Sequence, residues 1–139
     1  MCLKGLVLSD RGYNPLRWDC ESQGCFNIKC RPKIEVFSQC FPGKINFGDV
    51  DGIVEMNSKA LMLEWKPGKG LLTTGQRIMY RNLTSVAPIT VLCVVGSAET
   101  MVCESYSYYH KGKFHDSELA SLEKVMEFMS QWARWAVKK

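Results

Sequence analysis

The sequence predicts a single α/β domain, residues 1–139, in which helices flank a central mixed β-sheet and a small cysteine-rich extension precedes the sheet. Two runs at 50–56 and 60–66, separated by Asn-Ser-Lys, are typical of a β-hairpin. Residues 89–95 (ITVLCVV) form a continuous β-branched run, which is typical of a strand buried on both faces. Apolar residues at helical spacing across 117–137 predict a helix that packs on the sheet.

Two further elements complete the predicted order of strand, strand, helix, strand, strand, helix. A helix is expected to begin at Thr73 or Thr74, either of which can cap it, and to end near Thr84. A strand is expected over 102–110, before a turn at 111–113. The apolar stripe of the last helix comprises Leu119, Leu122, Val125, Met126, Met129, Trp132, Ala133 and Ala136. Phe128 and Trp135 widen this stripe and leave room for a homodimer contact.

Composition favours a globular protein that acts inside the cell. Hydrophobic residues make up 46% of the chain and charged residues 23%, and no apolar run is long enough to cross a bilayer. The first nine residues make a poor signal peptide, so we expect a cytoplasmic location and no membrane partner. The formal net charge of +4 permits contact with a polyanion such as DNA without requiring it.

Charged residues stand at one end of the predicted hairpin. Glu64 and Lys66 share one face of a strand because they are two residues apart, and Trp65 points to the other face. In a hairpin, the two strand ends that lie away from the turn are side by side, so Asp51 is expected beside this pair. Asp49 shares the face of Asp51. Carboxylates grouped with one lysine suit a hard cation such as Mg²⁺ or Mn²⁺.

This arrangement, Asp51 followed by Glu64-x-Lys66, resembles the PD-(D/E)xK nuclease superfamily. Gln76 and Tyr80 are similar to the QxxxY motif of its RecB-type and phage-exonuclease branches. In that family a helix follows the Glu-x-Lys strand and a buried strand follows the helix, which is the order predicted here. The resemblance implies a restriction-endonuclease-like fold.

The resemblance covers residues 45–96, which would form the catalytic core of a chain whose size is similar to that of small phage or archaeal nucleases. It implies a metal-dependent deoxyribonuclease that hydrolyses phosphodiester bonds of DNA. Asp51, Glu64 and the backbone carbonyl of Trp65 would hold Mg²⁺ or Mn²⁺, which would acidify a water and neutralise charge on the phosphate. Lys66 would orient or deprotonate that water, and the glutamine and tyrosine of the QxxxY motif would line the same channel.

Each of these residues also has a structural explanation. Glu64 and Lys66 can form an ion pair at a sheet edge, which contributes little to stability. Gln76 follows Thr73 by three residues, as in a capping box, and Tyr80 fits an amphipathic core position. These explanations correspond to an alternative function, a non-catalytic zinc-containing module that binds nucleic acid or protein on a degenerate nuclease scaffold.

Three features depart from the family pattern. Val50 replaces the proline that usually precedes the first aspartate, and the glutamate that many members carry on an N-terminal helix has no clear match, with Glu21 and Glu35 as weak candidates. Asp49 remains an alternative to Asp51 as the motif aspartate, although Asp51 sits better before the glycine.

The extension at 15–44 carries a cluster of cysteines, Cys20, Cys25, Cys30 and Cys40. Four thiolates are the number that a closed tetrahedral zinc site needs, and zinc would order a segment with few apolar residues. The alternatives are four reduced thiols or a [4Fe–4S] cluster. In RecB-type nucleases three of the cluster cysteines follow the catalytic core, whereas here all four precede it, which favours zinc.

Basic and aromatic residues outside the core could widen a DNA footprint through phosphate contact and base stacking. These residues are Lys29, Arg31, Lys33, Lys44, Tyr106, Tyr108, Tyr109, Lys111 and Lys113. Strand packing explains the three tyrosines about as well.

Overall fold

The computed structural model describes residues 32–69 and 71–138 of the chain. The chain divides between Asp49 and Val50 into two compact units, whereas the sequence placed the start of the core at residue 45. The described part of the first unit contains the 3₁₀ helix η2 (Ile34–Cys40). The rings of Phe37 and Phe41 meet Phe47 edge-on, with centroid distances of 6.1 and 5.5 Å.

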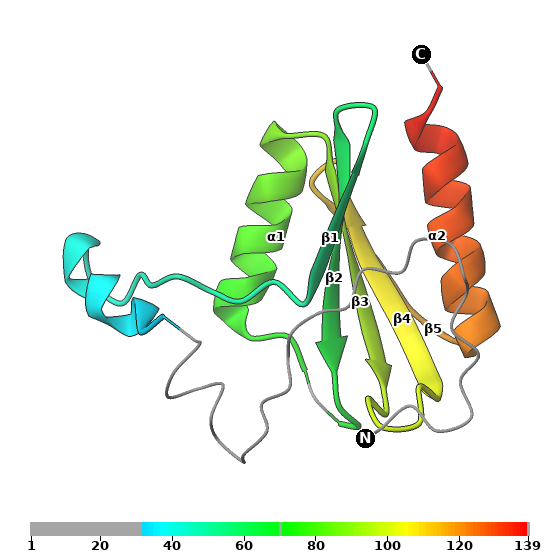
Figure 1. Ribbon diagram of the computed structural model, residues 1–139, viewed down its shortest axis with the longest axis horizontal. Coiled ribbons are helices and arrows are strands. Elements are labelled where there is room, and N and C mark those ends of the chain that lie inside the picture. Colours follow the sequence, from blue (N-terminus) through cyan, green and yellow to red (C-terminus); the bar gives the residue numbers. More distant parts are fainter. Residues whose placement is uncertain (1–31, 70, 139) are drawn as a thin grey trace. The chain divides into compact units, whose positions relative to one another are not determined.

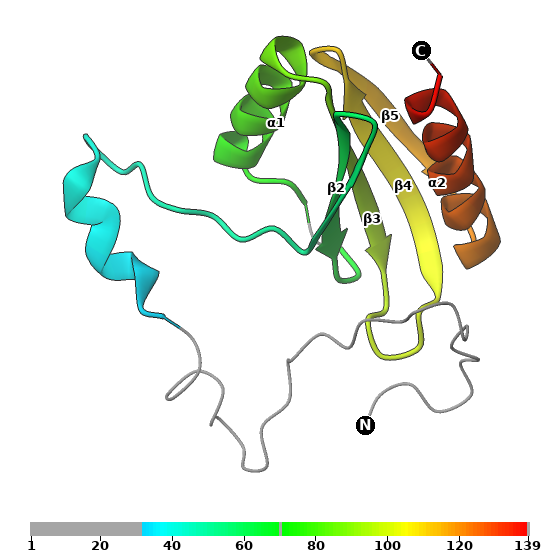
Figure 2. The ribbon, with the colours of Figure 1, turned by 45° about the horizontal axis from the view of Figure 1, so that its top comes forward.

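The second unit has a five-stranded sheet between two helices. Its strands are β1 (Gly52–Met56), β2 (Lys59–Lys66), β3 (Ile89–Gly96), β4 (Cys103–His110) and β5 (Lys113–Leu119). They lie in the order β1-β2-β3-β4-β5; β2 and β3 are parallel, and the other neighbours are antiparallel. Helices α1 (Thr74–Val86) and α2 (Leu122–Ala136) cover opposite faces (Figures 1 and 2). The predicted α/β class with a mixed sheet is therefore confirmed.

The β1–β2 hairpin sets the position of the charged residues. Asn57 and Ser58 form its turn with φ angles of 53° and 66°, the sign that two-residue hairpin turns favour. Gly52 then pairs with Leu63, so that the chain just before β1 reaches the end of β2. Lys59 belongs to β2 rather than to the predicted turn.

The connection from β2 to β3 runs through α1, as parallel neighbours require. Thr73 caps α1, and Tyr80 is its most buried side chain, with 2% exposed. Residues 90–94 of β3 are all buried, which confirms the strand predicted to be covered on both faces. Val91 belongs to the core beneath α1, and Leu92 belongs to the core beneath α2.

The predicted start of the last helix, at Ser117, is wrong. Residues 113–119 form strand β5, which pairs antiparallel with β4, and α2 begins at Leu122 after its cap Ser121. Leu119, placed by the sequence in the helical stripe, lies in β5 with 85% of its surface exposed, and Met126 is exposed as well. Pairing with β4 through the turn at 111–112 outweighs the helical spacing of these residues.

The aromatic residues of α2 and β4 contact one another within the unit. Phe128 packs on Tyr106 and Tyr108, with ring centroids 5.5 and 4.7 Å apart. Trp135 meets His110 at 5.1 Å. Tyr109 is buried on the opposite face of the sheet. These contacts account for the three tyrosines as packing residues.

Within the parts of the chain that the structure describes, no helix is both long enough and apolar enough to span a bilayer.

Candidate active site at the end of the β1–β2 hairpin

Asp51 lies against the end of β2. Its Oδ2 atom accepts a hydrogen bond from the backbone N–H of Trp65, with an N···O distance of 2.6 Å. The pairing of Gly52 with Leu63 brings the residue before β1 to this point. A carboxylate is thereby held beside the backbone that links Glu64 to Lys66.

Glu64 is a buried carboxylate, with 7% of its surface exposed. Its Oε1 atom accepts from Gln76 Nε2 at 3.0 Å, and its Oε2 atom accepts from the Tyr80 hydroxyl at 3.0 Å. The ammonium of Lys66 lies 3.3 Å from Oε1. Trp65 lies on the opposite face, where its indole N–H donates to the carbonyl of Gly96 at 3.1 Å.

The structure therefore brings five of the predicted residues together as one group, called here the Glu64 cluster: Asp51, Glu64, Lys66, Gln76 and Tyr80. Asp49, the alternative motif aspartate, belongs to the other compact unit.

Gln76 forms the capping box that the sequence offered as its structural explanation, and its side chain also donates to Glu64. Its backbone N–H donates to Thr73 Oγ1 at 3.1 Å, and its Oε1 accepts from the Thr73 N–H at 3.0 Å, which completes a capping box. The Oε1 atom faces the helix cap, so the Nε2 atom is left to donate to Glu64. Tyr80 follows by four residues and lies on the same side of α1, where it reaches the second oxygen of the carboxylate.

Burial and the nearby carboxylates control protonation in the cluster. Burial is the main cause that raises the pKa of Tyr80 far above its usual value. Glu64 and Asp51 raise this pKa further, because their negative charges disfavour the negatively charged phenolate form. Tyr80 therefore remains a hydrogen-bond donor to Glu64 at neutral pH. Burial also raises the pKa of the Cys93 thiol to about 12, with a further contribution from Glu64. The thiol is protonated, in keeping with the small core residue that the sequence predicts.

The donor atoms of the cluster fit a small hard cation. Asp51 and Glu64 supply carboxylate oxygens, and the Trp65 carbonyl is the third predicted ligand, so every donor is an oxygen. Among the described residues, no three or more His, Cys, Asp and Glu side chains gather at one point. Two carboxylates suffice for Mg²⁺, which retains several waters and binds substrate phosphate as well.

The four-cysteine cluster falls mostly outside the described residues, as do Lys29 and Arg31 of the predicted basic surface. Cys20, Cys25 and Cys30 lie in the part of the chain that the structure does not describe. Cys40 ends η2 as a free, exposed thiol.

A cleft beside Lys66 was missed at the level of sequence. It is lined by Arg77 of α1, by Ser105 and Ser107 of β4, and by Phe114 of β5. The one local signal is the alternation of small and large residues along β4, which places both serines on the same face as Cys93. The other lining residues come together only through the tertiary fold.

Comparisons of the chain with models of protein families, with curated proteins and with solved structures found no match. The chemistry of the Glu64 cluster is therefore inferred from its residues and their geometry: a buried carboxylate, a second carboxylate close by, and an ammonium group at contact distance.

Proposed function

We propose that the chain is a metal-dependent deoxyribonuclease of the PD-(D/E)xK type that hydrolyses phosphodiester bonds of DNA. One observation carries the proposal: Glu64 is buried beneath α1 yet pairs with Lys66 and is held by Tyr80. Removing both charges from water is costly, and an apolar pair would be as stable there. Charged groups kept in such a position are typical of functional sites.

In the proposed reaction, some residues of the Glu64 cluster bind the metal ion and others hold these ligands in place. Asp51, Glu64 and the Trp65 carbonyl would hold Mg²⁺ or Mn²⁺, and such an ion supplies an acidified water and neutralises charge on the phosphate. Lys66 presents its ammonium at the same point, where it orients the attacking water and stabilises the negative charge of the transition state. Gln76 and Tyr80 fix the orientation of the Glu64 carboxylate.

Cleavage of DNA is expected to require a divalent cation. Purified protein incubated with end-labelled single-stranded, double-stranded and branched DNA should produce shorter fragments in Mg²⁺ and none in excess EDTA, because the two carboxylates need the cation to act on a phosphate. Denaturing gel electrophoresis measures the fragments. Adding Mg²⁺ back to the EDTA-treated sample should restore cleavage, which controls for damage to the protein. Binding of DNA without cleavage in Mg²⁺ and in Mn²⁺ would contradict the proposal.

A specific observation favours the non-catalytic alternative. Both oxygens of Glu64 already accept hydrogen bonds from the chain, so the network also satisfies the buried groups of a purely structural site. A module that only binds nucleic acid or protein would show binding without cleavage, and Lys66→Ala would not change that binding beyond the loss of one positive charge.

We also propose that Cys20, Cys25, Cys30 and Cys40 bind one structural zinc ion. Protein purified without chelators should contain about one zinc per chain by elemental analysis, because four thiolates complete a tetrahedral site. Cys40→Ser should lower the zinc content, whereas Cys103→Ser, in the second unit, should leave it unchanged. Iron with visible absorbance would indicate an iron–sulfur cluster instead, and protein without metal would indicate reduced thiols.

A further inference from the structure

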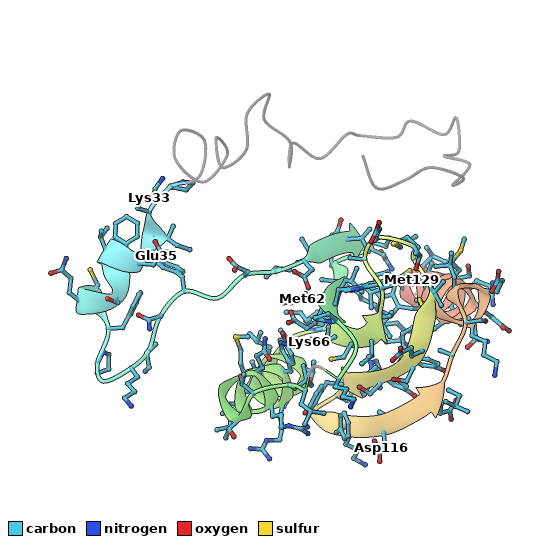
Figure 3. The ribbon with its side chains drawn as sticks, turned by 90° about the horizontal axis from the view of Figure 1, so that it is seen from below. Lys33, Glu35, Met62, Lys66, Asp116 and Met129 are labelled. Atoms are coloured by element: carbon cyan, nitrogen blue, oxygen red, sulfur yellow. The ribbon has the colours of Figure 1, made fainter. Side chains whose placement is uncertain are left out.

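A cleft of about 300 Å³ begins at the Glu64 cluster and extends across the sheet toward β5. Lys66 belongs to both the cluster and the cleft, and Asp116 marks the far side on the outer strand (Figure 3). Three cationic side chains line the cleft, those of Lys66, Lys69 and Arg77. Two carboxylates, of Glu104 and Asp116, line it as well.

The cleft exists because the side chains of its floor are small. Ser105, Ser107 and Tyr109 alternate along β4 and face the α1 side of the sheet. Tyr109 fills its position by packing against Tyr80 and Phe114, with ring centroids 5.9 and 4.9 Å apart. The two serines leave the remainder of this face open.

Phe114 and Arg77 form a side of the cleft on which a planar ring could stack. Phe114 has 42% of its surface exposed, and the Arg77 guanidinium carbon lies 6.0 Å from the centroid of its ring. The Nε atom of Arg77 donates to the Leu72 carbonyl at 3.4 Å, which holds the side chain near the start of α1. An exposed aromatic ring beside cationic groups is the combination that binds unpaired bases together with their phosphates.

We propose that this cleft binds one unpaired nucleotide of the DNA strand next to the scissile phosphate. The base lies against Phe114, and the backbone phosphate faces Lys69 and Arg77. The carboxylates of the cleft can accept hydrogen bonds from the amino groups of a base. The inference rests on the proposed nuclease function and adds the substrate class, which is single-stranded DNA or a strand with an unpaired end.

Size and stacking exclude a paired base from the cleft. Its volume lies at the lower limit of the range of about 300–1,000 Å³ found for small-ligand pockets. A base inside a duplex is stacked on both sides and must leave the helix before a protein side chain can reach its face. The cleft therefore distinguishes unpaired from paired strands, whichever bond is cleaved.

Binding measured in EDTA tests the cleft separately from catalysis. Fluorescence anisotropy gives the dissociation constants of a labelled oligothymidylate and of a blunt-ended duplex. Ser107→Phe fills the floor of the cleft, and it should weaken oligothymidylate binding by about 5- to 150-fold, the range for loss of one base stack, while duplex binding changes by less than about twofold. Ser130→Phe adds the same bulk to an exposed position on α2, in the opposite layer, and should leave both constants unchanged.

Phe114→Leu provides a second variant for the case in which Ser107→Phe does not fold. It removes the ring but retains an apolar side chain against Tyr109, and it should weaken oligothymidylate binding by about fivefold or more. Unchanged oligothymidylate affinity in the folded variants would overturn the inference, as would wild-type protein that binds the blunt-ended duplex as tightly as the single strand.

The two proposals can fail independently. If Phe114→Leu weakens single-strand binding but the wild-type protein cleaves no DNA in Mg²⁺, the cleft is supported and the nuclease proposal fails. If the wild-type protein cleaves paired and unpaired strands at equal rates and the cleft variants match it, the nuclease proposal is supported and the cleft inference fails.

Discussion

Lys66→Ala is expected to lower the rate of DNA cleavage by about 10²- to 10³-fold, the usual cost of removing one group that stabilises transition-state charge. The ammonium of Lys66 lies 3.3 Å from Glu64 Oε1, at the point where the cluster opens into the cleft. Without it, neither the attacking water nor the phosphate meets a positive side chain of the cluster. Initial rates on labelled single-stranded DNA in Mg²⁺ measure the loss.

Two control variants show whether the lower cleavage rate results from the position of the Lys66 ammonium or only from the loss of one positive charge. Lys124→Ala removes a positive charge from an exposed position of α2, on the face of the sheet opposite the cleft, and its rate should remain within about twofold of wild type because isolated surface charges contribute little. Lys66→Arg keeps the charge but changes the shape of the donor, and it should recover only part of the activity. Wild-type cleavage by Lys66→Ala, in protein that unfolds cooperatively on heating, would show that Lys66 takes no part in the reaction.

Glu64→Gln is expected to abolish cleavage while lowering the free energy of unfolding less than Glu64→Ala does. The introduced amide has nearly the same volume as the carboxyl group. Its oxygen can accept from Gln76 and Lys66, and its NH₂ group can donate to the hydroxyl oxygen of Tyr80, so only the Tyr80 O–H loses its acceptor. What disappears is the negative charge, which a hard cation requires. Cleavage rates and urea unfolding curves separate the two effects.

Glu64→Ala serves as the structural comparison. It leaves the buried Tyr80 hydroxyl and the Gln76 amide without their acceptor, and an unsatisfied buried donor costs about 1–3 kcal/mol of stability. Tyr80→Phe in the Glu64→Ala background removes the orphaned hydroxyl, so the double variant should lose less stability than the sum of the single variants. Wild-type cleavage by Glu64→Gln would rule out Glu64 as a cation ligand and, with it, the proposed mechanism.

The elements around the Glu64 cluster were predictable because their signals are local. The signals are the turn between β1 and β2, the Thr73 cap of α1 and the β-branched run of β3. The residues that make up each signal are only a few positions apart in the chain. An antiparallel hairpin leaves little freedom in which residues meet at its open end. The nearness of Asp51 to Glu64 and Lys66 could therefore be predicted from the sequence, and the hydrogen bond from Trp65 is its consequence.

The end of the sheet was not predictable in the same way. Residues 113–119 lie between a turn and a helix, and Leu119 continues the helical spacing of α2. Their backbone forms β5 because β4 offers a neighbouring strand, a partner that a periodicity within one segment cannot reveal.

The sequence by itself determined the α/β class, the hairpin, the cap of α1 and the identity of the charged residues, because spacing along a strand or a helix decides which side chains share a face. Only the tertiary structure decided that Gln76 uses one atom for the helix cap and another for Glu64. It also decided that Arg77, Ser107 and Phe114 border one cleft. These contacts join segments that are far apart in the chain, and the packing of α1 on the sheet brings them together.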